Sequence, residues 1–455
     1  MSVPPAFALS AFYEGVLQAA LRQFFRRASL EIEPGATVGA DRTLAIDSIT
    51  DPSVMRITWA ANAYTLRMPG RSTFTPHQIR MARAIVAVIG SRYRAILHPE
   101  LAAERGEMFR GPIEDRYVGA FFDERPYTTA VAGGIDRIAA VIEMLRVAAL
   151  SSYENRPIST GVVLLGGDFD PCRPELATGR EHPPSYMEAL ASIKSFYRLA
   201  DGVRTVFLAD ADGRLLDIID IDRWSRQLCP DKILDVPGAN AYQPHARATF
   251  EQGSVCVVLS PSRDINVFAE GAQVFSFHSA AWHLLDLKAK YELWADSVMN
   301  PVLALRLFQV ALDLADAREG ALFVVLRDPD EAAPQLVAPA DRLDIAIALD
   351  APGGGTVSRR EILHVLEGRT VTDLDPSVLS TLASLDGAIV VDREGRLLAA
   401  GAILRHPQSD ELSQGGFIEG ARTTAATAAS KFGPVLKVSE DGEITFYDRE
   451  RIWDI

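Results

Sequence analysis

Cysteine is scarce in this sequence, and a long uncharged apolar run is absent. The three cysteines, Cys172, Cys229 and Cys256, lie far apart and include no CxxC pair. Neither a disulfide framework nor a zinc ribbon is indicated, and a reducing cytoplasm is expected. No uncharged stretch approaches the ~20 residues that a membrane-spanning helix needs, and the N-terminus lacks the basic start and long apolar run of a secretion signal. We therefore expect no membrane partner.

Basic residues are also in short supply. Lysine and arginine together number 46, against 60 aspartates and glutamates, which gives a formal net charge of −14. Because nucleic-acid affinity depends largely on basic side chains that neutralise phosphates, DNA and RNA are not expected as partners. A small nucleotide is compatible with this charge, since one arginine and a metal ion can hold its phosphates locally.

The chain has 455 residues, of which 48% are hydrophobic, enough for two or three domains with their own cores. Apolar residues recur with helical spacing in four early segments: Phe12–Ala28, His77–Leu97, Ile135–Ala149 and Tyr186–Leu199. Thr205–Ile221 and Ser254–Phe277 have apolar runs interrupted by Asp-Gly and Glu-Gly turns, which is typical of β-hairpins. Residues 1–290 are therefore interpreted as a mixed α/β domain with room for two subdomains.

The start of a second domain is expected near Asn300. Residues 281–300 have the pattern of a charged amphipathic helix, and Asn300-Pro301 suits the N-cap and first turn of the next helix. Val302–Ala317 continues with helical spacing until Arg318-Glu319-Gly320 ends it, and Ala321–Arg327 is a short apolar run of the buried-strand type. Residues 291–455 are therefore predicted to form an α/β domain.

Two segments share a strand–turn–strand pattern: FLADADGRLLDII at 207–219 and IVVDREGRLLAAG at 389–401. A repeated hairpin accounts for both. The second segment follows Leu385-Asp386-Gly387-Ala388, which puts a carboxylate at the mouth of a strand beside two small residues that leave space for a ligand. Position 386 is therefore a candidate site residue.

Two further segments complete a candidate site. Gly420–Ala426 begins a helix of small residues, where free backbone N–H groups, two hydroxyls and an arginine suit an anion. Val435–Val438 and Ile444–Tyr447 flank the acidic turn of a hairpin. By contrast, the glycine triplet at 353–355 lacks the Gly-Lys-Ser/Thr of a phosphate loop and is interpreted as a surface loop.

Taken in order, LDGAIVVDREGRLLAAGAIL, GARTTAATAAS and VSEDGEITFY resemble three successive blocks of the diadenylate cyclase (DAC) domain family. These blocks are an Asp-Gly-Ala strand, a Gly-Thr-Arg-His-Arg-Ala-Ala helix start and a Val-Ser-Glu-Glu hairpin. The upstream ALDLADAREGALFVVL at 311–326 is similar to the family's opening helix and strand. The resemblance implies a DAC-like domain with a twisted mixed β-sheet flanked by helices.

The resemblance also implies a reaction. In the family, two DAC domains face each other, each holds one ATP, and each 3′-hydroxyl attacks the α-phosphorus of the other ATP with loss of pyrophosphate. The product is cyclic di-AMP. One protomer alone cannot complete the ring, so a homo-oligomer is expected.

By the same resemblance, Asp386 is the catalytic carboxylate, which binds Mg²⁺, Mn²⁺ or Co²⁺ and draws the proton from the attacking hydroxyl. The implied nucleotide-binding residues are Gly387, Ala388, Leu404, Ala421, Arg422, Thr423, Thr424 and Ser439. Glu440 or Asp441 assists the metal, and the two stay alternatives. Leu404 is assigned to the adenine, with ordinary core packing as its alternative.

The phosphate motif departs from the family pattern. Thr423 and Thr424 stand in place of the family's His and second Arg, and Ala421 in place of a Thr, so the motif reads Arg-Thr-Thr. A hydrogen bond to a charged group contributes about 1.5–3 kcal/mol. Losing two such bonds without replacement lowers a rate by about two to four decades. Three basic residues are candidates to substitute: Arg405, His406 and Lys431.

The leading hypothesis is a cytoplasmic diadenylate cyclase of weak or specialised activity. Such domains often follow sensor modules, and residues 265–287 resemble the hairpin and helix that end one, so residues 1–290 are assigned a regulatory role with a small-molecule or protein signal. The first alternative is a catalytically degenerate sensor that binds ATP or a cyclic dinucleotide. The second alternative is a scaffolding protein with a relic fold.

Overall fold

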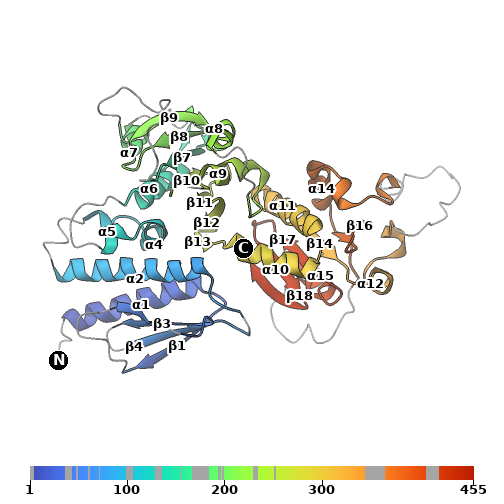
Figure 1. The fold of residues 1–455 in the computed structure, drawn as a ribbon, viewed down its shortest axis with the longest axis horizontal. Coiled ribbons are helices and arrows are strands. Elements are labelled where there is room, and N and C mark those ends of the chain that lie inside the picture. The colour runs from blue at the N-terminus through green and yellow to red at the C-terminus, as the bar shows by residue number, and fades with distance from the viewer. Residues whose placement is uncertain are drawn as a thin grey trace. The chain divides into compact units, whose positions relative to one another are not determined.

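The computed structural model describes residues 5–35, 44–47, 50–59, 62–70, 72–98, 106–128, 136–153, 155–166, 184–192, 196, 199–228, 234–250, 253–343, 364–405 and 420–455. They fall into two compact units (Figure 1), the first made of residues 1–230 and 248–286 and the second of residues 231–247 and 287–455. Both units combine helices with mixed sheets, which confirms the predicted α/β fold class. No helix among the described residues is long and apolar enough to cross a membrane.

The first unit begins with an antiparallel sheet of order β1-β4-β3-β2. Its strands are β1 (Ser29–Pro34), β2 (Leu44–Asp47), β3 (Val54–Trp59) and β4 (Asn62–Arg67). The helices α1 (Pro5–Phe24) and α2 (Pro76–Leu97) lie over this sheet, as Figure 1 shows. Thr75 and Gln78 form a capping box that fixes the start of α2, as this residue pair does at helix N-termini.

A seven-stranded sheet follows, with the order β13-β12-β11-β10-β7-β8-β9. Its strands are β7 (Thr160–Leu164), β8 (Thr205–Ala209), β9 (Leu215–Asp220), β10 (Val255–Leu259), β11 (Ile265–Ala269), β12 (Ala272–His278) and β13 (Ala281–Leu284). Only β7 and β8 are parallel among these neighbours. The remaining elements are η1 (Gly106–Phe109), α4 (Ile113–Phe122), α5 (Arg125–Thr128), α6 (Arg137–Ala149), β5 (Ser152–Tyr153), β6 (Arg156–Pro157), α7 (Tyr186–Ser192) and α8 (Ile221–Leu228).

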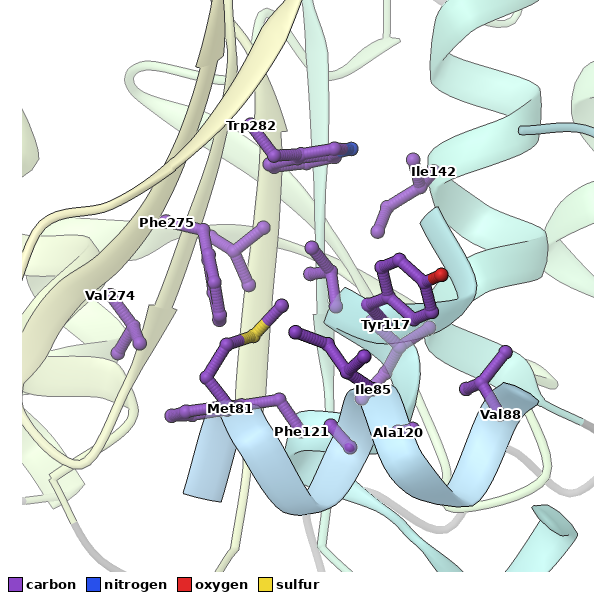
Figure 2. Packing of buried hydrophobic residues seen from close by; sticks show 14 of the residues in the cluster. Met81, Ile85, Val88, Tyr117, Ala120, Phe121, Ile142, Val274, Phe275 and Trp282 are labelled. Carbon is purple, nitrogen blue, oxygen red and sulfur yellow. The ribbon is translucent and has the colours of Figure 1, made fainter. Parts of the chain in front are cut away.

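One hydrophobic core joins these parts of the first unit. Figure 2 shows Met81 and Ile85 of α2 beside Phe121 of α4 and Phe275 of β12. The spacing of four residues puts Met81 and Ile85 on one face of the helix, as the periodicity of the sequence predicts. Trp282 of β13 packs against Phe275 in this core, and the residue is 1% exposed.

The structure corrects the prediction of a helix over residues 281–300. Ala281–Leu284 is strand β13, paired antiparallel with β12, and α10 begins only at Leu287 and ends at Val298. Ser279 and Ala280 have φ angles of 50° and 61° and make a two-residue turn, the geometry that joins strands in a tight hairpin. Pairing with β12 and burial of Trp282 therefore override the helical periodicity of this segment.

A charged group at the start of α2 gives the first unit a pH-dependent contact. His77 lies 3.5 Å from the Asp286 carboxylate and 3.6 Å from that of Glu270. These contacts, that with Asp286 first, raise the pKa of His77 to about 9. The contact with His77, ahead of that with Arg80, lowers the pKa of Glu270 to about 2.

We expect the free energy of unfolding to fall as pH rises from 6.5 to 9. The histidine is charged in the folded unit up to about pH 9 and in the unfolded chain only below its ordinary value of 6.5, so its contribution is complete below 6.5 and lost above 9. Because Glu270 is 57% exposed, solvent screening limits the change to about 1 kcal/mol. Denaturant titrations at pH 6.5 and 9 test this, and a His77→Gln chain with an unchanged pH dependence would contradict it.

The second unit is built on a six-stranded sheet of order β16-β15-β14-β17-β18-β19. Its strands are β14 (Ala321–Val325), β15 (Ala388–Val391), β16 (Leu397–Ala402), β17 (Val435–Val438), β18 (Ile444–Asp448) and β19 (Glu450–Asp454). The pair β14 and β15 is parallel and the others are antiparallel. The helices are α10 (Leu287–Val298), α11 (Pro301–Ala317), α12 (Pro329–Leu336), α14 (Pro376–Ala383) and α15 (Ala421–Ala429), with short η5 (Pro339–Asp341), η6 (His364–Leu366) and η7 (Val371–Asp373).

Helices cover both faces of this sheet. On one face, α12 and α15 pack against Leu322 and Val324 of β14. On the other face, the rings of Trp294 in α10 and Phe446 pack with their centroids 5.4 Å apart. The rings of Phe308 in α11 and Trp453 pack with their centroids 5.9 Å apart. The alternation of side chains along a strand produces these two apolar faces. Residues 353–355 lie outside the described part of the chain.

An earlier segment of the chain joins the second unit through α11. It holds η4 (Asn240–Tyr242) and the start of α9 (Gln243–Ala248). The backbone N–H and side-chain amide of Asn240 each donate to the Asp313 carboxylate at 2.6 Å. Burial, opposed by these hydrogen bonds, raises the pKa of Asp313.

Candidate functional site

The predicted site residues gather at one edge of the six-stranded sheet of the second unit, at the end of the strands where β14 begins. Asp386 and Gly387 directly precede β15, which runs parallel to β14, so both strands start at this edge. Ser439 directly follows β17, whose Val438 pairs with Ala321, the first residue of β14. Neighbouring strands lie about 4.8 Å apart. Asp386 and Ser439 therefore flank Gly320, the residue before β14.

Arg422 reaches the same edge from α15. A Cβ atom added to Gly320 would lie 2.1 Å from Nη1 of Arg422, so the guanidinium occupies the space that the glycine leaves open. Nη1 also donates to Oε1 of Glu440 at 2.9 Å, and the Glu440 side chain is 75% exposed. Asp386, which is exposed, and Arg422 thus both lie beside Gly320 although 36 positions (422 − 386) separate them in the chain.

The start of α15 adds backbone donors beside this arginine. Gly420 is the N-cap and provides no side-chain hydrogen bond to the first turn. First-turn N–H groups of a helix lack partners within the helix and suit an anion. Ala421 is exposed, and Thr424 is half-buried with its backbone N–H donating to Gly420 O at 3.2 Å.

Lys437 is a basic residue at this site that the sequence analysis missed. It lies in the middle of β17, its side chain is 9% exposed, and its Nζ donates to Oγ1 of Thr423 at 3.3 Å. It pairs with Leu322, so both face α15. A lysine inside an otherwise apolar strand was the available signal, because lysine is rarely buried without a partner.

Ser439 organises the acidic turn after β17. Its hydroxyl donates to a carboxylate oxygen of Asp441 and accepts from the backbone N–H of Glu443 at 3.2 Å. The hydrogen bond from Ser439 lowers the pKa of Asp441. The two alternatives for a second metal ligand thus have different hydrogen-bond partners. Glu440 accepts from Arg422, and Asp441 accepts from Ser439.

The small residues at the start of β15, Gly387 and Ala388, pack against other parts of the second unit. Gly387 has φ = +116°, and a Cβ there would lie 2.3 Å from the carbonyl carbon of Gly401 in β16. The missing side chain admits the neighbouring strand. Ala388 is 1% exposed and Leu404 is 7% exposed, and both belong to the hydrophobic core.

The chemistry of the donor set suits Mg²⁺ or Mn²⁺ held together with a nucleotide. Among the described residues, no group of three histidine, cysteine, aspartate or glutamate side chains is placed to hold a metal alone. Such ions are commonly bound through one or two carboxylates plus substrate phosphates, and Asp386 is an exposed carboxylate at this edge. Of the suggested substitute bases, Arg405 and Lys431 are exposed, and His406 lies outside the described residues.

The second unit is thus an α/β domain whose sheet edge collects carboxylates, an arginine and a buried lysine. No protein-family model matches the chain, and no curated protein matches it. Among solved structures, a double mutant of DacA from Staphylococcus aureus is 21% identical. The match covers 34% of this chain and 86% of that chain with a TM-score of 0.21.

Proposed function

We propose that the second unit is a diadenylate cyclase-like nucleotidyltransferase that condenses two ATP molecules into cyclic di-AMP and releases pyrophosphate. One observation carries the proposal: the Arg422 guanidinium lies on Gly320, at the sheet edge that also holds Asp386 and Ser439. A triphosphate needs positive charge beside a carboxylate that handles the proton of the attacking hydroxyl. This edge offers both.

Each residue of the proposed site has its own role in this reaction. Arg422, Lys437 and the first turn of α15 bind phosphate oxygens. Asp386 takes the proton from the 3′-hydroxyl of one ATP. The 3′-oxygen then bonds to the α-phosphorus of the facing ATP, and pyrophosphate leaves. A divalent metal would supply charge neutralisation between Asp386 and the phosphates. Homo-oligomerisation, cytoplasmic location and regulation through the first unit by a small molecule or protein belong to the same proposal.

The test is incubation of the purified full chain with ATP and Mg²⁺, Mn²⁺ or Co²⁺, followed by mass detection of nucleotide products. Cyclic di-AMP together with pyrophosphate supports the cyclase. ATP binding without any dinucleotide product supports the second candidate, a catalytically degenerate ATP or cyclic-dinucleotide sensor. The pairing of Arg422 with Glu440 at 2.9 Å favours this candidate, because a carboxylate already occupies the arginine.

Lys437 is expected to compensate for the missing basic residues of the Arg-Thr-Thr motif. Replacing it by methionine keeps the length and apolar stem of the side chain, so the fold is expected to persist. Loss of one hydrogen bond to a charged group weakens ATP binding by about tenfold or more. Calorimetric titration of ATP measures this.

Lys431→Met is the matched control for Lys437→Met. Lys431 is exposed beyond the C-terminal end of α15, away from Gly420. ATP affinity should stay at the wild-type value in this control. Equal losses in the two variants would mean that Lys437 acts only through general charge.

A further inference from the structure

Arg92 of α2, in the first unit, has two buried hydrogen-bond donors that lack an acceptor. Its Nε and Nη2 atoms are shielded from solvent and donate to no group in the described part of the chain. Folded proteins leave few buried donors unpaired, because each one loses its hydrogen bonds to water, and the loss is greater for a charged group. The two atoms therefore point to an acceptor that binds at Arg92.

Nε and Nη2 form the edge of the guanidinium that holds a carboxylate with two parallel hydrogen bonds. Arg146 in the same unit uses this edge, since its Nε donates to Oδ2 of Asp115 at 2.8 Å and its Nη2 to Oδ1 at 2.6 Å. The planar fork of arginine matches the two oxygens of a carboxylate in spacing and direction. The buried edge of Arg92 is thus suited to the same kind of group.

Tyr117 of α4 adds a third unpaired donor near Arg92. The residue is 1% exposed, and its hydroxyl is buried without a hydrogen-bond partner among the described residues. Figure 2 shows this hydroxyl on the side of the ring that faces away from Phe275 and Met81. Burial raises the pKa of Tyr117, with the Glu114 charge adding to the rise and the Arg92 charge opposing it. The hydroxyl therefore keeps its proton and can donate it to an anion.

Aromatic rings lie around the Arg92 side chain. The guanidinium carbon is 5.7 Å from the ring centroid of Phe109 in η1. Tyr13 of α1 is 4% exposed, and its ring centroid is 6.1 Å from that of Tyr93. Burial raises the pKa of Tyr13, and the Arg92 charge opposes this rise, which places the two side chains near each other. A few polar groups among aromatic side chains are typical of sites for small organic ligands.

The charges near Arg92 favour a ligand group with one negative charge. Burial lowers the pKa of Arg92, and the nearby Arg116 lowers it further. Arg116 already has two acidic neighbours, since Nη1 lies 3.5 Å from Asp136 and Nη2 lies 3.6 Å from Glu143. A doubly charged phosphate beside Arg92 would keep one buried charge uncompensated, which is costly. A carboxylate carries the single charge that Arg92 balances.

We propose that the first unit binds the carboxylate of a small organic acid among α1, α2 and α4, held by the Nε and Nη2 edge of Arg92 and by the Tyr117 hydroxyl. This binding is independent of the proposed cyclase reaction. The site also names a ligand class for the regulation through the first unit, and only that regulatory role rests on the proposed function.

Acetate is the probe for this site, because it is a small carboxylate with one charge. The dialysed full chain is melted at pH 7 in increasing sodium acetate. Sodium chloride at equal ionic strength and acetamide, which has the same shape without the charge, are the references. At ten times its dissociation constant, acetate should raise the melting temperature by about 2–5 °C. A rise no larger than that in chloride or acetamide would overturn the proposal.

Two variants assign this effect to the site. Tyr117→Phe removes a hydroxyl that has no partner, so the melting temperature without acetate should not fall. Arg92→Lys keeps the charge but loses the fork. In each variant, the acetate concentration that gives half of the shift should increase about tenfold or more. An unchanged acetate response of Tyr117→Phe, or its lower melting temperature without acetate, would overturn the proposal, since the hydroxyl would then have a role within the fold alone.

Arg83→Met is the matched control. Arg83 is exposed on α2, and its replacement removes one positive charge outside the site. Its response to acetate should equal that of the wild type, and a lost response would mean that acetate acts through general charge. Sodium phosphate stabilises folded proteins by exclusion from their surface, so its shift should be the same in the wild type and in Arg92→Lys. A larger shift in the wild type would overturn the assignment of a carboxylate.

The regulatory role has a separate readout. The rate of dinucleotide formation from ATP and Mn²⁺ is measured with and without acetate, in the wild type and in Tyr117→Phe. Acetate should change the rate only in the wild type. An unchanged rate beside a clear rise in melting temperature would exclude regulation and leave the binding site established. If the wild type makes no dinucleotide, the cyclase function fails, while the melting temperatures still decide whether the carboxylate site exists.

Discussion

Replacing Asp386 by asparagine is expected to lower the rate of cyclic di-AMP formation by about 10²–10⁴-fold, the usual contribution of a positioned general base. Asparagine has nearly the same size, so ATP and the surrounding strands keep their places, but it cannot accept the proton of the ribose hydroxyl. Asp386 is exposed at the sheet edge, and its replacement leaves the core intact. Mass detection of the dinucleotide under single-turnover conditions measures the effect.

Glu394→Gln is the matched control for Asp386→Asn. Glu394 lies in the turn between β15 and β16 and its side chain is 68% exposed. The same carboxylate-to-amide change at this turn removes one negative charge from the same hairpin without touching the proposed site. Its activity should equal that of the wild type. A similar loss in both variants would assign the effect to net charge, and full activity of Asp386→Asn would exclude the proposed role.

Local signals predicted much of the second unit. Asn300 accepts a hydrogen bond from Leu303 N–H at 3.2 Å and caps α11 as expected, because a short polar side chain satisfies the first N–H groups of a helix. The predicted strand begins at Ala321, and the hairpins over 389–401 and 435–447 are present. Arg318, with φ = 60°, takes the left-handed position that ends α11. The sequence analysis placed the end of this helix within Arg318-Glu319-Gly320.

Strands and contacts that depend on pairing between distant segments were not predicted from local sequence signals. β13 pairs with β12, and β19 pairs with β18, and neither strand was predicted. Lys437 was read only as part of an apolar strand, since its contact with Thr423 spans 14 positions. The shared pattern at 207–219 and 389–401 was interpreted as a repeated hairpin. The strand order of the sheets around these hairpins depends on contacts far apart in the sequence.

The convergence of Asp386 and Arg422 at one edge was predicted through the resemblance, not from their spacing. Its physical basis is the parallel pair β14 and β15, which brings two strand starts together, combined with the absence of a side chain at Gly320. A glycine ahead of a buried strand is a weak sequence signal, because glycine also ends helices. Only the contact with the Arg422 guanidinium shows which role this glycine has.

Gly387→Ala is expected to destabilise the second unit by about 2–6 kcal/mol, the sum of backbone strain of about 1–3 kcal/mol and steric overlap of about 1–3 kcal/mol. The glycine has φ = +116°, and an added Cβ would lie 2.3 Å from the carbonyl carbon and 2.4 Å from the oxygen of Gly401. Both are backbone atoms, so no side chain can move aside. Hydrogen exchange of the β15 and β16 amides, together with denaturant unfolding of the full chain, measures the loss.

Gly395→Ala separates strain from overlap in the same hairpin. Gly395 also has positive φ, +83°, but its added Cβ would meet only the Leu303 side chain, with Cδ1 at 3.4 Å and Cδ2 at 3.9 Å, which are ordinary contacts. Strain alone costs about 1–2 kcal/mol, so this variant should retain slow exchange in β15 and β16. If Gly387→Ala proved as mild as Gly395→Ala, the close approach of β16 would not be what requires glycine at 387. The space beside Asp386 would then be open to a ligand, as the sequence first indicated.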